Sequence, residues 1–151
     1  MKPPRKLTVL PLIVVFWDEQ MWKGNPRFFT DRIDDLDLAL GPGYAPKSMT
    51  IYAGPDYHRS EDGTSPAYWQ ARFFTEKGCK YLGIRVPDEN GRDVILPPLG
   101  PGFYQDCMFK EGLNWTEDNI VFSKIKSFRF VEHKFTIFND YLPPQLKDKN
   151  K

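Results

Sequence analysis

The chain has 151 residues, 40% of them hydrophobic and 15% aromatic, with 21 lysine and arginine residues against 20 aspartate and glutamate residues. This length suits one domain with enough apolar material to bury a core. The near balance of charge provides no field that would attract nucleic acid or an acidic membrane, so no nucleic-acid partner is expected. Fourteen prolines and eleven glycines supply frequent turns, and together with the aromatic residues they predict an all-β fold.

The first predicted element is a core strand over 9–17, an apolar run interrupted only by Pro11. The run follows a basic start, as a secretory signal does. However, no small-x-small cleavage site follows it, and Asp18-Glu19 comes at once. It is also too short to span a bilayer. We therefore expect an uncleaved first strand, no membrane span, and a cytoplasmic rather than a secreted protein.

The chain is then predicted to fold back on itself after Trp17 and to return over 27–30. The segment Trp22-Lys23-Gly24 ends this hairpin, and its glycine supplies a positive φ that most residues cannot adopt. A closing strand is predicted at 48–53. The hydroxyl of Ser48, which opens that strand, can bond the hairpin backbone and hold it down.

A second, degenerate copy of this pattern follows. It offers an aromatic residue at Phe74, an acidic residue at Glu76, and an aromatic-x-glycine at Tyr81 and Gly83. Phe74 and Gly83 are nine positions apart, whereas the corresponding residues of the first copy are seven apart. Ser127 opens the predicted closing strand of this copy.

The remaining predicted elements are local. They are a helical turn or two within 31–40, a mobile polar loop at 56–65, a hairpin of 81–86 with 93–96 whose tip is Asp88 to Gly91, and strands at 128–131 and 135–138 around a turn at 132–134.

These two segments resemble the paired Greek-key motifs of the βγ-crystallin family. Trp17, Asp18 with Glu19, Trp22 with Gly24, and Ser48 match in order the aromatic, acidic, aromatic-x-glycine and serine positions of that motif. The resemblance covers roughly 13–132 and implies a single two-motif Greek-key β-sandwich with long loops over 1–142, followed by a disordered tail over 143–151. It also implies a structural or protein-binding module, with roles such as inhibitor, toxin or host-interaction factor.

Calcium is the ligand for which that family is best known. The site needs an Asn or Asp pair shortly before the closing serine. In the second copy these positions hold Phe122 and Ser123, and in the first copy Gly43 and Tyr44. The pair Asp118-Asn119 lies four residues too early. The motif is therefore degenerate, and we expect no bound metal or cofactor.

No catalytic residue is assigned from the sequence. His58 lies in the predicted loop and His133 at the predicted turn, and neither has a positioned partner nearby. The acidic residues Asp31, Asp34, Asp35 and Asp37 are predicted to form a solvated cluster. An alternative function stays open: a small effector or hydrolytic enzyme that uses this acidic 31–37 cluster or His58.

Four aromatic residues beside the long loop are predicted to contact a protein partner: Tyr52, Tyr57, Tyr68 and Trp69. The identity of that partner and the oligomeric state do not follow from the sequence. Cys79 and Cys107 have no metal-binding spacing and are predicted to be buried or partly buried thiols, with one disulfide as the alternative.

Overall fold

A computed structural model describes residues 7–80, 85–87, 93–95, 98–106 and 122–134 of the chain. Strands dominate the elements in these ranges. The elements are β1 (Leu12–Glu19), β2 (Lys23–Phe29), α1 (Leu36–Leu40), β3 (Ser48–Ala53), β4 (Ala67–Phe74), a 3₁₀ turn at Lys77–Cys79, β5 (Arg85–Pro87), β6 (Asp93–Ile95), β7 (Gly102–Gln105), a 3₁₀ turn at Phe122–Lys124, and β8 (Ser127–Lys134).

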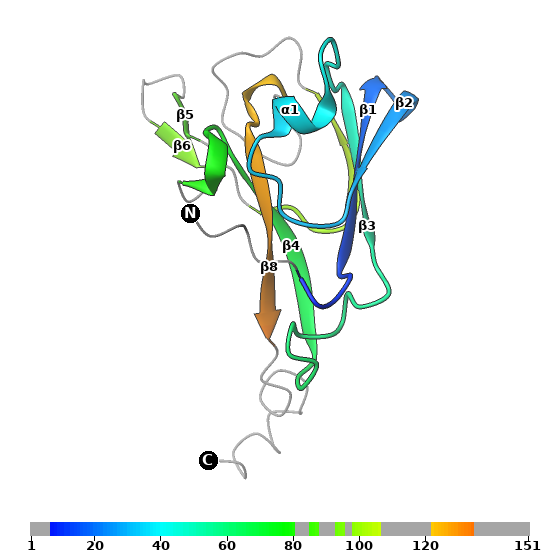
Figure 1. The fold of residues 1–151 in the computed structure, drawn as a ribbon, viewed down its shortest axis with the longest axis vertical. Coiled ribbons are helices and arrows are strands. Elements are labelled where there is room, and N and C mark those ends of the chain that lie inside the picture. Colours follow the sequence, from blue (N-terminus) through cyan, green and yellow to red (C-terminus); the bar gives the residue numbers. More distant parts are fainter. Residues whose placement is uncertain (1–6, 81–84, 88–92, 96–97, 107–121, 135–151) are drawn as a thin grey trace, which may run out of the picture.

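The strands form two facing layers, with β1, β2 and β3 on one side of the molecule and β4 and β8 on the other (Figure 1). The first layer is a four-stranded sheet in the order β2-β1-β3-β7, and the second is the pair β4-β8. A further small pair is formed by β5 and β6. All of these pairings are antiparallel.

The hydrophobic core lies between the two layers. Alternate residues of each strand face it, as the two-residue repeat of a strand requires. Phe16 of β1 meets Phe128 of β8 across the layers, with ring centroids 6.2 Å apart. The inward-facing residues are Leu12, Val14 and Phe16 in β1, Met49 and Ile51 in β3, Trp69, Ala71 and Phe73 in β4, and Phe128 and Phe130 in β8.

The helix α1 lies at one end of the sandwich (Figure 1). The Asp35 side chain caps it by accepting a hydrogen bond from the backbone N–H of Leu38. Leu36 and Leu40, four residues apart, are both buried, so one stripe of this single turn faces the core. Gly41 follows with a φ of 98° and ends the helix. The predicted helical turn within 31–40 is confirmed.

The two halves of the chain exchange pairing partners. Ile33, in the first half, forms two backbone hydrogen bonds of 3.0 Å each with Phe128 in β8. In return β7, from the second half, pairs with β3 in the first sheet. Each half therefore contributes one segment that pairs with a strand of the other half.

The all-β prediction is confirmed at the level of antiparallel sheets of four and two strands with one short helix. The predicted closing strand at 48–53 is β3, and β5 pairs with β6 as expected. The turn predicted at 132–134 was wrong, because these residues continue β8 and pair with Ala67, Tyr68 and Trp69. The predicted hairpin tip at 88–91, the strand at 135–138 and the tail at 143–151 lie outside the described residues.

Candidate functional site

The first hairpin is held down by Ser48, as the sequence predicts. The Ser48 hydroxyl oxygen accepts a hydrogen bond of 3.0 Å from the backbone N–H of Trp22 and donates one of 2.7 Å to the backbone carbonyl of Glu19. Ser48 is completely buried at the start of β3. A single hydroxyl thus links both sides of the turn between β1 and β2 to the closing strand.

The second segment has the same arrangement. The Ser127 hydroxyl oxygen accepts a hydrogen bond of 3.0 Å from the backbone N–H of Cys79 and donates one to the carbonyl of Glu76. Glu76 and Cys79 are three residues apart, as Glu19 and Trp22 are in the first segment. The prediction that Ser127 opens the closing strand is confirmed, while the predicted Gly83 lies outside the described residues.

Both turns place two successive residues in the left-handed region. Met21 and Trp22 have φ values of 61° and 57°, and Gly78 and Cys79 have values of 79° and 53°. Three of these four are not glycine, and a left-handed residue with a side chain costs about 1–2 kcal/mol. The hydrogen bonds to the serines offset this cost. Gly24 also has a positive φ, of 89°, as predicted.

Trp22 adds a second anchor for this turn. Its indole N–H donates hydrogen bonds to the carbonyls of Met49 and Tyr104, at 3.1 and 3.3 Å. Its ring packs edge-on against Phe103, with centroids 5.1 Å apart. The folded turn is therefore anchored to β3 and β7.

A cleft of about 220 Å³ lies beside the segments that precede the two serines. Asp37, Lys47, Asp106 and Lys126 contribute its charged groups. The Asp106 carboxylate accepts a hydrogen bond of 2.8 Å from the backbone N–H of Phe122, and burial raises its pKa. Lys126 forms an ion pair of 2.9 Å with Asp37. The cleft therefore mixes both signs of charge, and each of its two carboxylates already has a partner.

The residues at the expected calcium positions have other roles. Phe122 is buried in the core, and the Tyr44 hydroxyl hydrogen-bonds the carbonyls of Phe16 and Asn25. Burial raises the pKa of Tyr44 to about 12, and the Arg27 guanidinium lies 4.4 Å from the centre of its ring. Within the described residues no three or more His, Cys, Asp or Glu side chains are grouped to hold a metal ion.

The strongest candidate for a binding surface is the outer face of the four-stranded sheet, the side turned away from the core. The strand register aligns Phe28, Val15, Thr50 and Phe103 in one row across all four strands. Ile13 and Tyr52 form the adjacent row on one side. The row on the other side consists of Pro26, Trp17, Ser48 and Gln105, and no charged residue occurs in the three rows.

The two ends of the central row project into solvent. Phe28 and Phe103 are each 64% exposed, whereas Val15 and Thr50 between them are buried. Two polar atoms of this sheet, Thr50 Oγ1 and Trp17 Nε1, are buried and have no hydrogen-bond partner among the described residues. Such groups cost about 1–3 kcal/mol each. The sheet therefore has exposed aromatic rings around an uncharged centre.

The four predicted contact residues do not form one surface. Tyr52 is 44% exposed on the outer face of the four-stranded sheet. Tyr68 points outward from the second layer, where its ring stacks on that of His133 at 4.7 Å. Tyr57 is half-buried against the core. Placing Trp69 on the surface was wrong, because it is 1% exposed and its indole N–H donates a 2.8 Å hydrogen bond to the Arg59 carbonyl.

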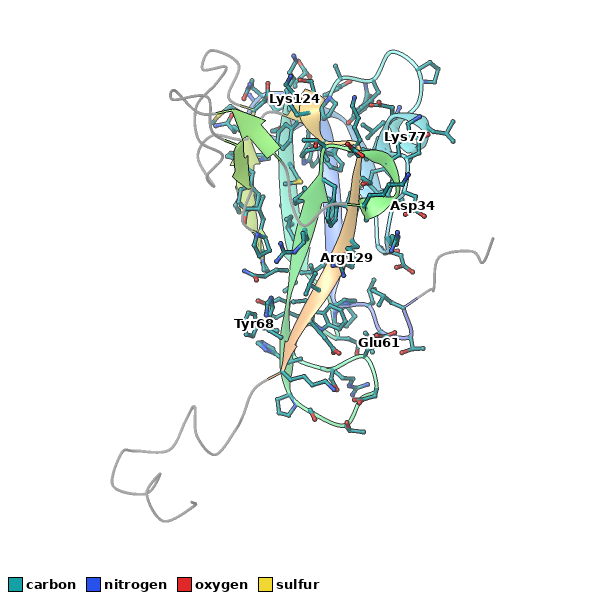
Figure 2. The ribbon with its side chains drawn as sticks, turned by 90° about the vertical axis from the view of Figure 1, so that its left-hand side faces the viewer. Asp34, Glu61, Tyr68, Lys77, Lys124 and Arg129 are labelled. Atoms are coloured by element: carbon teal, nitrogen blue, oxygen red, sulfur yellow. The ribbon has the colours of Figure 1, made fainter. Side chains whose placement is uncertain are left out.

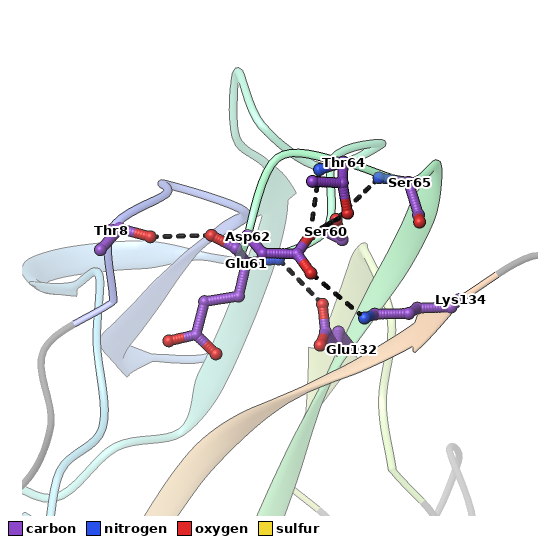
Figure 3. Close-up of polar contacts among 8 residues, drawn as sticks. All are labelled: Thr8, Ser60, Glu61, Asp62, Thr64, Ser65, Glu132 and Lys134. Carbon is purple, nitrogen blue, oxygen red and sulfur yellow. Dashed lines mark hydrogen bonds and ion pairs between the residues drawn. The ribbon is translucent and has the colours of Figure 1, made fainter.

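The loop at 56–65, predicted to be mobile, is densely hydrogen-bonded (Figure 3). One carboxylate oxygen of Asp62 accepts hydrogen bonds from the Ser60 hydroxyl, the Thr64 hydroxyl and the Thr64 N–H. These bonds, with that from Ser60 contributing most, hold the pKa of Asp62 well below its usual value. Glu132 and Lys134 tie the loop to β8. The loop is thus part of the ordered structure.

The residues of the alternative enzyme hypothesis are each engaged separately. Asp34 pairs with Arg32, Asp35 caps α1 and pairs with Lys77, and Asp37 pairs with Lys126. The two oxygens of Asp31 accept hydrogen bonds from the N–H groups of Leu7 and Arg32. His58 is exposed and its ring contacts that of Tyr57. No acid–base pair is assembled among these described side chains.

Cys79 is a free thiol, and burial raises its pKa. Cys107 lies outside the described residues.

Comparisons with protein-family models, with curated proteins and with solved structures find no match to this chain. None of the helices in the described ranges has the length and apolar character needed to cross a bilayer.

The two exposed phenylalanines of the central row, Phe28 and Phe103, were not predicted from the sequence. Phe28 and Phe103 are 75 positions apart in the sequence, and only the pairing of β7 with β3 brings them into one row. The signal available was the alternation within β3, which puts Thr50 and Tyr52 on one face.

Proposed function

We propose that this chain is a non-enzymatic β-sandwich of βγ-crystallin type that binds a protein partner through the outer face of its four-stranded sheet. The observation that carries this proposal is the uncharged row whose ends, Phe28 and Phe103, are largely exposed. Phe28, Phe103 and Tyr52 expose apolar surface on this one face, and exposed apolar patches mark interaction sites. Aromatic residues without neighbouring charge are the composition of interface centres.

The strand order supports the Greek-key part of the proposal. A Greek key arranges its four strands in the spatial order 4-1-2-3. In the first half β3, β1 and β2 take the 4-1-2 order, while the third segment, at Ile33, pairs with the opposite layer. In the second half β8, β4 and Leu99 take the same order, and β7 joins the first sheet. This reciprocal exchange, together with one serine that holds the turn in each half, supports two motifs in one domain.

The binding surface can be tested by placing a charge in it. Phe28→Arg and Phe103→Arg each put a guanidinium on the uncharged face, at positions where the wild-type side chain is 64% exposed. Leu38→Arg is the matched control, because Leu38 is 79% exposed on α1, outside that face. Partners would be captured on immobilised wild-type and variant proteins and identified by mass spectrometry, and self-association would be measured by analytical ultracentrifugation.

We expect one protein, either a different chain or a second copy of this one, to bind the wild type and Leu38→Arg but neither phenylalanine variant. Binding that is equal for all four proteins would show that this face is not the contact surface. Loss of a hydrolytic activity on changing His58 or Asp35 would instead support the enzyme alternative.

A further inference from the structure

The outer face of the second layer carries two arginines directly opposite each other. Within β4 the buried residues Ala71 and Phe73 flank Arg72, and within β8 the buried residues Phe128 and Phe130 flank Arg129. Arg72 and Arg129 are paired in the register of these strands. Both side chains therefore leave the same face, the one onto which Figure 2 looks and on which Arg129 is labelled.

This arrangement is unfavourable in the protein alone. Side chains directly opposite across an antiparallel pair have Cβ atoms about 4.5–5.5 Å apart, and like charges there are destabilising. Five other basic side chains in the described residues are relieved by ion pairs: those of Arg32, Arg59, Lys77, Lys126 and Lys134.

No ion pair or hydrogen bond relieves either Arg72 or Arg129 within the described part of the chain. The contact of Arg129 is with an aromatic ring, since its guanidinium carbon lies 5.9 Å from the centre of Phe74. Arg129 also borders a shallow depression whose other charged residues are Asp31, Arg32 and Glu61. The oxygens of Asp31 are bound to the backbone N–H groups of Leu7 and Arg32.

We propose that Arg72 and Arg129 form a binding site for a phosphate-type oxyanion. Each guanidinium presents a planar fork of N–H donors that matches two oxygens of a phosphoryl group, and the two positive charges match a dianion. An anion held between the forks replaces the repulsion of the two arginines by two attractions. The site lies on the layer opposite the proposed protein-binding face, so it stands or falls independently of that proposal.

The test is a titration with inorganic phosphate at constant ionic strength, read by calorimetry and by the melting temperature. The wild type is compared with Arg72→Gln, Arg129→Gln and Lys124→Gln. Lys124 is exposed, so its variant loses one positive charge away from the site. Arg129→Lys keeps the charge and the packing stem but loses the fork, which covers the case in which Arg129→Gln fails to fold.

We expect phosphate to raise the melting temperature of the wild type and of Lys124→Gln, and sodium chloride at the same ionic strength to have no such effect. Each Arg→Gln change should raise the dissociation constant at least tenfold, and Arg129→Lys severalfold. Without phosphate, Arg72→Gln should melt no lower than the wild type, because the repulsion is removed. This combination separates loss of a ligand from loss of the fold.

A second arm replaces inorganic phosphate by O-phosphoserine. Tenfold tighter binding of phosphoserine would identify a phosphorylated side chain as the source of the anion, and equal binding would identify the free ion. The proposal is overturned if phosphate stabilises the wild type no more than chloride does, or if the arginine variants respond to phosphate as Lys124→Gln does.

Discussion

Replacing Ser48 by alanine should destabilise the whole domain, because one hydroxyl makes both bonds that close the first turn. The change removes the hydrogen bond from the Trp22 N–H at 3.0 Å and that to the Glu19 carbonyl at 2.7 Å. Each net hydrogen bond is worth about 0.5–1.5 kcal/mol, and each backbone group left without a partner adds to the loss. The expected loss in the free energy of unfolding is therefore about 2–3 kcal/mol.

This loss is large beside the total stability of a small domain, about 5–15 kcal/mol. With a slope of about 1–3 kcal/mol per molar urea, it should lower the midpoint of urea unfolding by about 1 M or more. Tryptophan fluorescence follows the transition. Ser127→Ala should behave in the same way, because Ser127 bonds Cys79 and Glu76.

Ser123→Ala is the matched control. Ser123 is exposed, and surface substitutions of this kind stay within about 0.5 kcal/mol of the wild type. If Ser48→Ala also stays within that range, the two bonds do not hold the turn and the reasoning is refuted.

Three further predictions follow from the same region. Gly24→Ala should lower the free energy of unfolding, measured in urea, by about 1–3 kcal/mol, because φ is +89° and a Cβ atom would lie 2.0 Å from Asp18 Oδ1. Gly43→Ala is the control and should lose less, because φ is +76° there but no atom lies within 4 Å of the added Cβ atom. Equal losses would contradict the steric argument. The pKa of Tyr44 is raised to about 12, so its contribution to stability is complete below the unfolded pKa near 10 and is lost as the pH rises towards 12. The fall in melting temperature at alkaline pH should therefore be shallower in Tyr44→Phe than in the wild type. Parallel curves for the two proteins would argue against this role of Tyr44. Calcium at millimolar concentration should leave the melting temperature unchanged, and a rise of several degrees would mean that a calcium site has been overlooked.

The first hairpin could be predicted from the sequence because its determinants are local. Its residue types are compatible with few other conformations. They indicate a positive φ at Gly24, a turn at Trp22 and a closing strand at 48–53. The bond from Trp22 to Ser48 then follows from that geometry.

The second hairpin was predicted only in part. The aromatic-x-glycine pattern places the expected glycine at Gly83, which lies outside the described residues, and the left-handed pair of the described turn is Gly78 with Cys79. A cysteine at a positive φ has no sequence signature. Ser127 was identified because an alternating strand follows it.

The candidate surfaces could not be predicted from the sequence, for two reasons. Successive strand residues point to opposite faces, so Tyr68 and Trp69 cannot share one surface, yet nothing local says which of them faces the core. In addition, β7 was not predicted, because Gly102 to Gln105 follow a proline- and glycine-rich segment and pair with β3, far earlier in the chain. The row ending in Phe103 depends on that distant pairing.

Each half of the chain contains a turn held by one serine hydroxyl. Amide hydrogen exchange measured by NMR tests it most directly at Trp22 and Cys79. Both amides should be protected in the wild type. Ser48→Ala should expose the amide of Trp22 but not that of Cys79, and Ser127→Ala should do the reverse. Rapid exchange at both amides in the wild type would contradict it.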